Sequence, residues 1–206
     1  MATLLKASLV FIAFALLHSI TASGPFKGLV SRIFGQEATD RYYRLSFNVF
    51  SAVITAAAGY VIFSQPDTVL YRPPWYILWP AHAVQAAGIT LLIIAFRPFD
   101  AGSFLGTRPQ AGKVELTTSG AYGLVRHPMY LAGILVFLFE PDVTVNSLAV
   151  RGLATVYFIY GAFMEERRLV TEYGEEYSEY KKRVPMFDII TGIIRRKGRS
   201  SCSRKS

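Results

Sequence analysis

The chain has 206 residues, of which 52% are hydrophobic and 17% are charged, with a formal net charge of +8. An ordinary soluble domain carries about 25% charged residues, so this composition argues against a soluble globular enzyme. Its 15 Phe, 12 Tyr and 2 Trp exclude a disordered chain, and its one cysteine, Cys202, excludes a disulfide scaffold.

Five apolar segments are predicted to be helices, since a helix crosses the bilayer core with about 20 apolar residues. The fourth is too short to cross alone, so we predict that it forms a helical hairpin with the fifth. We expect the first to be a retained helix and not a signal peptide, because further spans follow it. The predicted class is all-α, a polytopic membrane bundle of about five helices in a single domain over 1–194, with a basic, disordered tail over 195–206. In chain order, the segments are 7–23, 45–64, 75–96, 129–139 and 143–164.

The loop charges predict the orientation of these helices. Basic residues are frequent in alternate loops and in the tail, which carries 11 of the 22 Lys and Arg from Arg167 onward. Because cytoplasmic loops are enriched in Lys and Arg, we expect a multi-pass protein with a cytoplasmic C-terminus. A basic tail that follows apolar spans favours an anionic membrane surface as its partner, and no nucleic acid.

A first polar motif precedes the fourth segment, from Gly120 to Tyr130. Pro128 suits the first turn of a helix, where its missing N–H is not needed. A helix N-terminus favours an anion, and Arg126 and His127 lie beside it in sequence, so the motif suits a carboxylate or phosphate. The alternative is a positive-inside anchor whose proline starts a helix.

A second motif, Glu165-Glu166-Arg167-Arg168, ends the last apolar segment. Two carboxylates at a helix C-terminus oppose the helix dipole, so they need cations, which the arginines or a ligand amine can supply. Ribose hydroxyls are another possible ligand, and a solvated face is the alternative.

The segment 166–184 is predicted to be an amphipathic helix that Gly174 can bend or end. The helix either lies on the lipid headgroups or covers a site formed by the other two motifs. Its apolar face has the spacings 4, 4, 3 and 4 and consists of Leu169, Tyr173, Tyr177, Tyr180 and Val184.

Polar residues inside apolar segments are functional candidates by default. Structural pairing or snorkelling is the better explanation for His82 and Arg151, whereas His18 is equally consistent with a structural and a functional role. The three histidines, His18, His82 and His127, are far apart in sequence and lack metal-ligand spacing. We therefore predict no metal site.

The ordered combination of these motifs resembles the integral-membrane methyltransferases, the superfamily of isoprenylcysteine carboxyl methyltransferase and the phospholipid methyltransferases. The resemblance covers about 116–187 and implies an S-adenosylmethionine site without a Rossmann domain. It rests on Arg126-His127-Pro128-Met129-Tyr130, Glu165-Glu166, Tyr173-Gly174, Tyr177, Tyr180, Arg183-Val184-Pro185 and Phe187. Carried over, the cofactor-binding residues would be Gly120, Tyr122, Arg126, His127, Tyr130, Gly133, Glu165 and Glu166.

The N-terminal half is similar to a narrower set, the methanethiol S-methyltransferase and NnrU-like groups. The residues that carry this similarity are His18-Ser19, Ala22-Ser23, Lys27, Arg41-Tyr42-Tyr43-Arg44-Leu45, Phe47-Asn48, Phe99-Asp100 and Phe104-Leu105-Gly106. The resemblance implies methyl transfer from S-adenosylmethionine to a small or lipid-like thiol such as methanethiol. An isoprenylcysteine carboxylate or a lipid amine is the alternative acceptor. An NnrU-like haem-binding protein or isomerase is the alternative function, disfavoured by the Glu165-Glu166 pair and the tyrosine-rich tail.

A sulfonium methyl group is already activated, so catalysis would need chiefly in-line positioning and a dry site. In that scheme Arg126 and His127 hold the carboxylate of the cofactor and Glu165 or Glu166 holds its ammonium group or ribose. Methylation of a thiol requires the thiolate. His18 and His127 are the candidate catalytic bases.

Overall fold

The computed structural model describes residues 2–108 and 115–194, which form two compact units. The first comprises Met1–Arg72, Phe99–Lys113 and Asp142–Leu153, and the second comprises Pro73–Pro98, Val114–Pro141 and Ala154–Ser206. The single domain expected over 1–194 stays a prediction, and the tail 195–206 lies outside the described residues.

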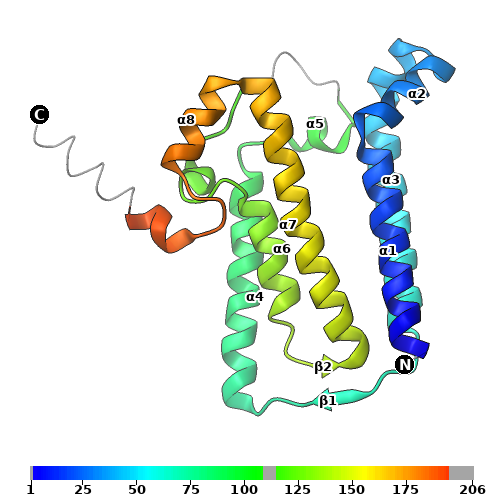
Figure 1. The fold of residues 1–206 in the computed structure, drawn as a ribbon, viewed down its shortest axis with the longest axis vertical. Coiled ribbons are helices and arrows are strands. Elements are labelled where there is room, and N and C mark those ends of the chain that lie inside the picture. The colour runs from blue at the N-terminus through cyan, green and yellow to red at the C-terminus, as the bar shows by residue number, and fades with distance from the viewer. Residues whose placement is uncertain (1, 109–114, 195–206) are drawn as a thin grey trace, which may run out of the picture. The chain divides into compact units, whose positions relative to one another are not determined.

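The first unit is built on two long helices that pack side by side, α1 and α3 (Figure 1). The short α2 follows α1 and precedes α3 in the sequence. It begins where the Ser23 hydroxyl accepts a hydrogen bond from the Phe26 amide, and it ends at Gly35, whose φ is 86°. Ala7 and Ile62 are buried in a small core. The helices of this unit are α1 (Ala2–Ala22), α2 (Gly24–Phe34), α3 (Gln36–Phe63) and α5 (Ala101–Leu105).

Two short strands in the first unit, β1 (Val69–Tyr71) and β2 (Val143–Thr144), pair in an antiparallel ribbon that the sequence analysis did not predict. The Asp67 carboxylate accepts a hydrogen bond from the Asn146 amide at 3.1 Å beside this ribbon. Segments so short carry little periodicity, so the pairing is visible only in three dimensions.

The second unit packs α4 (Trp75–Phe96) along α6 (Pro128–Leu138), as Figure 1 shows. Gly88 permits this close approach, because a Cβ there would lie 3.1 Å from the Ala132 carbonyl oxygen. A 3₁₀ turn, η1 (Gly120–Gly123), precedes α6.

Side chains also pack α6 against the part of α7 (Val145–Tyr173) that belongs to the second unit. The Phe158 ring lies between Tyr130 and Phe137, with ring centroids 6.3 and 5.9 Å apart. Gly133 faces the same ring, since a Cβ there would lie 2.8 Å from it. This contact confirms the predicted hairpin of a short and a long helix.

Among the described residues, four helices are long and apolar enough to cross a membrane: α1, α3, α4 and α7. Together with α6, they confirm the all-α polytopic class, and the 11 residues of α6 agree with the expected short arm. The last apolar segment and the first part of the predicted helix 166–184 form one continuous helix, α7, which continues to Tyr173 and places Glu165 and Glu166 inside it. Gly174, with φ 58°, then separates α7 from α8 (Glu175–Arg183).

Candidate active site

The motif before α6 is fixed to a segment sixty residues later by two backbone hydrogen bonds. The amide of Arg126 donates to the Pro185 carbonyl at 2.9 Å, and that of His127 donates to the Met186 carbonyl at 3.3 Å. Proline at the first position then starts α6 directly after His127. The chain that follows α8 therefore forms one wall of the site.

Arg126 and Glu166, predicted to hold opposite ends of a cofactor, bind each other. Arg126 Nε and Nη2 lie 2.7 and 2.6 Å from Glu166 Oε1, and both side chains are about 90% buried. Arg126 Nη1 donates to the carbonyls of Lys181 and Val184. The Lys181 ammonium lies 3.0 Å from Glu166 Oε2. The pair therefore ties α7, the start of α6 and the end of α8 together.

His127 lies between the two adjacent carboxylates. Its Nε2 is 3.4 Å from Glu166 Oε1 and its Nδ1 is 3.7 Å from Glu165 Oε2. The side chain is 4% exposed, and the rings of Tyr130 and Phe187 flank it. A histidine with an acceptor near each ring nitrogen is held in orientation and can carry a proton on either one.

Glu165 is the more accessible of the two carboxylates, with one third of its side chain exposed. Tyr130 lies close enough to interact with it electrostatically, and the exposed Arg168 guanidinium lies 3.7 Å away. Burial raises the pKa of the nearby Tyr122 hydroxyl, and the negative charge of Glu165 raises it to a smaller extent. The exposed edge of the cluster thus presents one carboxylate, one guanidinium and aromatic rings.

The predicted apolar face of 166–184 packs against protein and forms a small core around this site. Tyr177, Tyr180 and Val184 are buried there, and Leu116 packs on them. The Tyr180 hydroxyl donates to the Tyr122 carbonyl at 2.6 Å. The tyrosine spacing predicted the face, but no sequence signal identified Lys181 or Pro185 as partners of Arg126.

The predicted site residues fall into two groups. All eight cofactor candidates lie in the second unit, whereas His18 lies in the first, where its ring contacts Phe14 and Phe47. Gly120 has a left-handed φ of 59° and open space where a Cβ would lie, while Gly133 accommodates the Phe158 ring.

The two other polar residues predicted inside apolar segments have structural contacts. His82 on α4 is exposed, and its Nδ1 lies 3.0 Å from Gln85 Oε1. Arg151 is buried and donates to the Asp142 carbonyl and to the Ser147 hydroxyl. These contacts agree with the structural pairing expected for both.

No protein-family model matches the chain, and no solved structure matches it. Several curated proteins do. The chain is 37% identical over 73 residues to the methanethiol S-methyltransferase of Crocosphaera subtropica, a match that covers 35% of this chain and 29% of that protein. It is 35% identical over 99 residues to that of Pseudomonas deceptionensis, covering 47% and 38%.

A third relative, methanethiol S-methyltransferase 1 of Bradyrhizobium diazoefficiens, is 42% identical over 65 residues, or 32% of this chain and 23% of that protein. The chain is similar to methanethiol S-methyltransferases. The matches span between about a quarter and two fifths of the length of these relatives. They support that part of the resemblance, whereas the wider superfamily and the NnrU-like grouping stay predictions.

Proposed function

We propose that this chain is an S-adenosylmethionine-dependent membrane methyltransferase that methylates a small thiol of the methanethiol class. The observation that carries the proposal is the cluster of Glu165, His127 and Tyr130 at the start of α6, in a chain similar to enzymes named for thiol methylation. The other acceptors, an isoprenylcysteine carboxylate and a lipid amine, are outcomes of the test below.

The donor set at this cluster suits the polar end of S-adenosylmethionine. Glu165 offers a partly exposed carboxylate for an ammonium group or for ribose hydroxyls, and the Tyr130 ring offers a π face for a cation. Arg168, exposed and 3.7 Å from Glu165, is a cation for the cofactor carboxylate. Arg126 is less suited to that role than its sequence position indicated, because its three nitrogens already have protein partners.

Within this proposal, Arg126, Glu166 and Lys181 are a frame and not direct ligands. Their buried ion pairs hold the start of α6 next to α7, so the orientation of His127 and Glu165 is set before any ligand arrives. Fixing groups in advance is how a site lowers the entropic cost of a reaction between two bound molecules. Bound S-adenosylmethionine would supply a methyl group already activated on a sulfonium.

The residues of the chain would then position the acceptor and exclude water. The buried core of Tyr177, Tyr180 and Val184 would help to exclude water from one side of the cluster. Methylation of a thiol requires its thiolate, and a ring nitrogen of His127 is the group in this cluster that we propose takes the proton. The catalytic roles of His127 and His18 stay predictions.

The test is methyl transfer by the purified protein in lipid nanodiscs. Methyl-labelled S-adenosylmethionine is supplied with methanethiol, an isoprenylcysteine analogue or a lipid amine, and the labelled product is identified by mass spectrometry. We expect label on methanethiol as dimethyl sulfide. Boiled protein is the control for the uncatalysed reaction.

Two results would contradict the proposal in different ways. Label on the carboxylate or the amine alone would keep methyl transfer and replace the acceptor. Absence of transfer to every acceptor, with no measurable binding of S-adenosylmethionine and a Soret band in the purified protein, would replace methyl transfer by the haem-binding alternative.

A further inference from the structure

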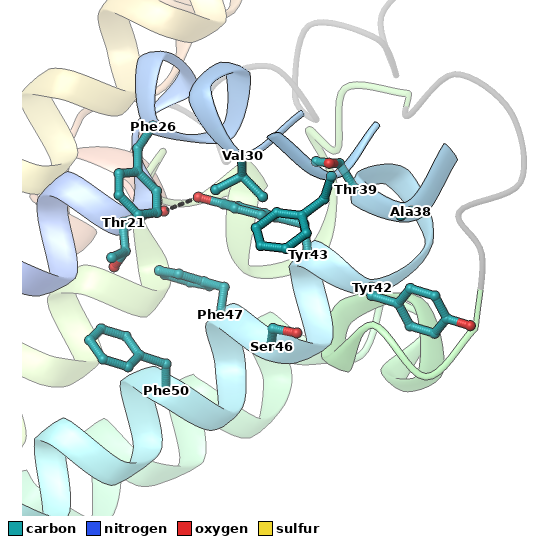
Figure 2. Close-up of a pocket in the computed structure, with 11 residues that line it drawn as sticks. Thr21, Phe26, Val30, Ala38, Thr39, Tyr42, Tyr43, Ser46, Phe47 and Phe50 are labelled. Atoms are coloured by element: carbon teal, nitrogen blue, oxygen red, sulfur yellow. Dashed lines mark hydrogen bonds between the residues drawn. The ribbon is translucent and has the colours of Figure 1, made fainter. Parts of the chain in front are cut away.

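A cavity of about 520 Å³ lies in the first unit, far along the chain from the cluster described above. It is open to the outside and is lined by residues of the end of α1, of α2 and of the first half of α3, as Figure 2 shows. Its lining includes six large apolar or aromatic side chains, those of Phe26, Val30, Phe34, Tyr43, Phe47 and Phe50. Five of these six are aromatic, so the cavity offers a large apolar contact area.

Three of the five hydroxyl-bearing residues that line the cavity, Thr21, Thr39 and Tyr43, donate to the protein backbone. Tyr43 donates to the Thr21 carbonyl at 2.5 Å, the dashed line in Figure 2. Thr21 in turn donates to the Leu17 carbonyl, and Thr39 donates to the Gly35 carbonyl, each at 2.8 Å. With these protons committed, the wall around Phe47 and Phe50 offers a ligand mainly dispersion and hydrophobic contact. The chemistry of the cavity therefore favours a hydrocarbon.

The cavity crosses the boundary between the charged and apolar parts of α3. The first turns of α3 carry four charges, whereas no charged residue occurs from Leu45 to Phe63. Thr39 and Tyr43 line the cavity from the charged turns, and Phe47 and Phe50 line it from the apolar part. A ligand that fills the cavity would therefore contact both the charged turns and the apolar part of α3.

Two cations are adjacent in sequence to residues that line the cavity, Lys27 to Phe26 and Arg41 to Tyr42. Lys27 on α2 lies 3.1 Å from Asp40, and the Arg41 guanidinium lies 5.2 Å above the Tyr42 ring, which lines the cavity. From residue 24 to residue 44, the four basic residues outnumber the two acidic ones. Basic residues at the headgroup level are attracted to anionic lipids.

The length and the side chains of α2 are consistent with a position at the membrane surface. It is an 11-residue helix with Lys27 and Arg32 on it, and it exposes Leu29, Ile33 and Phe34 by 51 to 70%. Short helices with basic and apolar faces lie in the interface plane. The helix that covers the cavity would thus sit where phospholipid headgroups are.

We propose that this cavity binds one acyl chain of an anionic phospholipid, with the headgroup beside Lys27 and Arg41. The volume falls within the range of about 300–1,000 Å³ found for ligand pockets. Phe47 and Phe50 contact the chain, and α2 covers it. The proposal does not depend on methyl transfer, since each of its residues lies in the first unit.

The test is photo-crosslinking in nanodiscs with a phosphatidylglycerol that carries a diazirine on its acyl chain. We expect labelled positions at 26–50 whose yield saturates and is competed by unlabelled phosphatidylglycerol. The same photoactive chain on phosphatidylcholine should label these positions less. Equal labelling by both lipids would overturn the anionic preference.

Pocket-filling variants separate a bound lipid from the lipids that surround any membrane helix. Ala38→Trp places a ring in the cavity, and Val53→Trp places one on the same helix, outside the lining. We expect Ala38→Trp to lower the saturable labelling at least about fivefold, or 1 kcal/mol of binding, and Val53→Trp to leave it unchanged. Val30→Trp is a second pocket-filling variant, should the first not fold. Labelling that does not saturate, or that is equal in all variants, would overturn the proposal.

Discussion

Arg126 and Glu166, forty residues apart, form a buried ion pair with each other at 2.6 Å. A buried charge is tolerated when it is paired and hydrogen-bonded, and here the Lys181 ammonium pairs with the second oxygen of the carboxylate. The pair therefore stabilises the fold around the cluster, and the accessible carboxylate beside it, Glu165, is the better candidate for ligand contact.

Removing one member of this pair should destabilise the protein. Breaking a buried ion pair costs about 3–5 kcal/mol, and we expect Arg126→Gln to lie near the lower end because Lys181 still faces Glu166. Reversible unfolding in mixed micelles measures the change.

The double variant Arg126→Gln/Glu166→Gln should lower the unfolding free energy by less than the sum of the two single variants. Lys182→Gln, which breaks the exposed pair with Glu179, is the matched control and should cost no more than about 1 kcal/mol. Equal costs for Arg126→Gln and Lys182→Gln would contradict a stabilising role.

Changing Glu165 should affect ligand binding more than stability. If Glu165 accepts a charge-assisted hydrogen bond from S-adenosylmethionine, Glu165→Gln removes roughly 1.5–3 kcal/mol, or about 10- to 150-fold in affinity. Equilibrium binding of S-adenosylmethionine in nanodiscs measures this loss. Glu179→Gln on the exposed side of α8 is the control and should bind as the parent does. An unchanged affinity in Glu165→Gln would remove this residue from the proposed site.

The packing of α6 on α7 predicts a steric effect at Gly133. Gly133→Ala places a Cβ 2.8 Å from the Phe158 ring, which Tyr130 and Phe137 prevent from moving freely. Overpacking of this kind costs about 1–3 kcal/mol. Phe158→Leu should relieve the strain in the double variant. Gly152→Ala, with open space around it, is the control and should be neutral or stabilising. Similar unfolding free energies for the two alanine variants would show that the ring can move aside.

The hydrogen bond from Tyr180 to the Tyr122 carbonyl should contribute measurably to stability. Tyr180→Phe should lower the unfolding free energy by about 1 kcal/mol at neutral pH, whereas Tyr60→Phe, at an exposed position, should have no effect. Burial raises the pKa of Tyr180, so its contribution is complete below the unfolded value of about 10 and is lost as pH rises through the folded value. A difference between Tyr180→Phe and the parent that grows with falling pH would contradict this assignment.

The loop charges predict that the loop before α4 and the segment after α7 lie on opposite faces of a membrane. In a Cys202→Ser background, Asp67→Cys should react with a membrane-impermeant maleimide added outside intact cells, and Lys182→Cys should react only after permeabilisation. Labelling of both from the same side would refute the orientation.

Most helix positions were predictable, because an apolar run of about 20 residues is a local property of the sequence. The third span, 75–96, was predicted at the bounds that α4 has, and α6 begins one residue before the predicted start, at Pro128. The break at Gly174 was expected from the sequence, whereas the continuity of α7 from the apolar segment into the charged turns was not, and Tyr173 packs there against the core of α8.

The composition and apolar segments of this chain determined by themselves that it is an all-α membrane protein, and the resemblance of its motifs implied that Arg126, His127, Glu165 and Glu166 belong together. Only the tertiary structure decided how they are paired. The partners of Arg126 are the Glu166 carboxylate and the backbone carbonyls of Lys181, Val184 and Pro185. A carbonyl has the same chemistry at every position in a sequence, so which ones a guanidinium contacts is set by the fold, through the burial that makes each unpaired polar group costly.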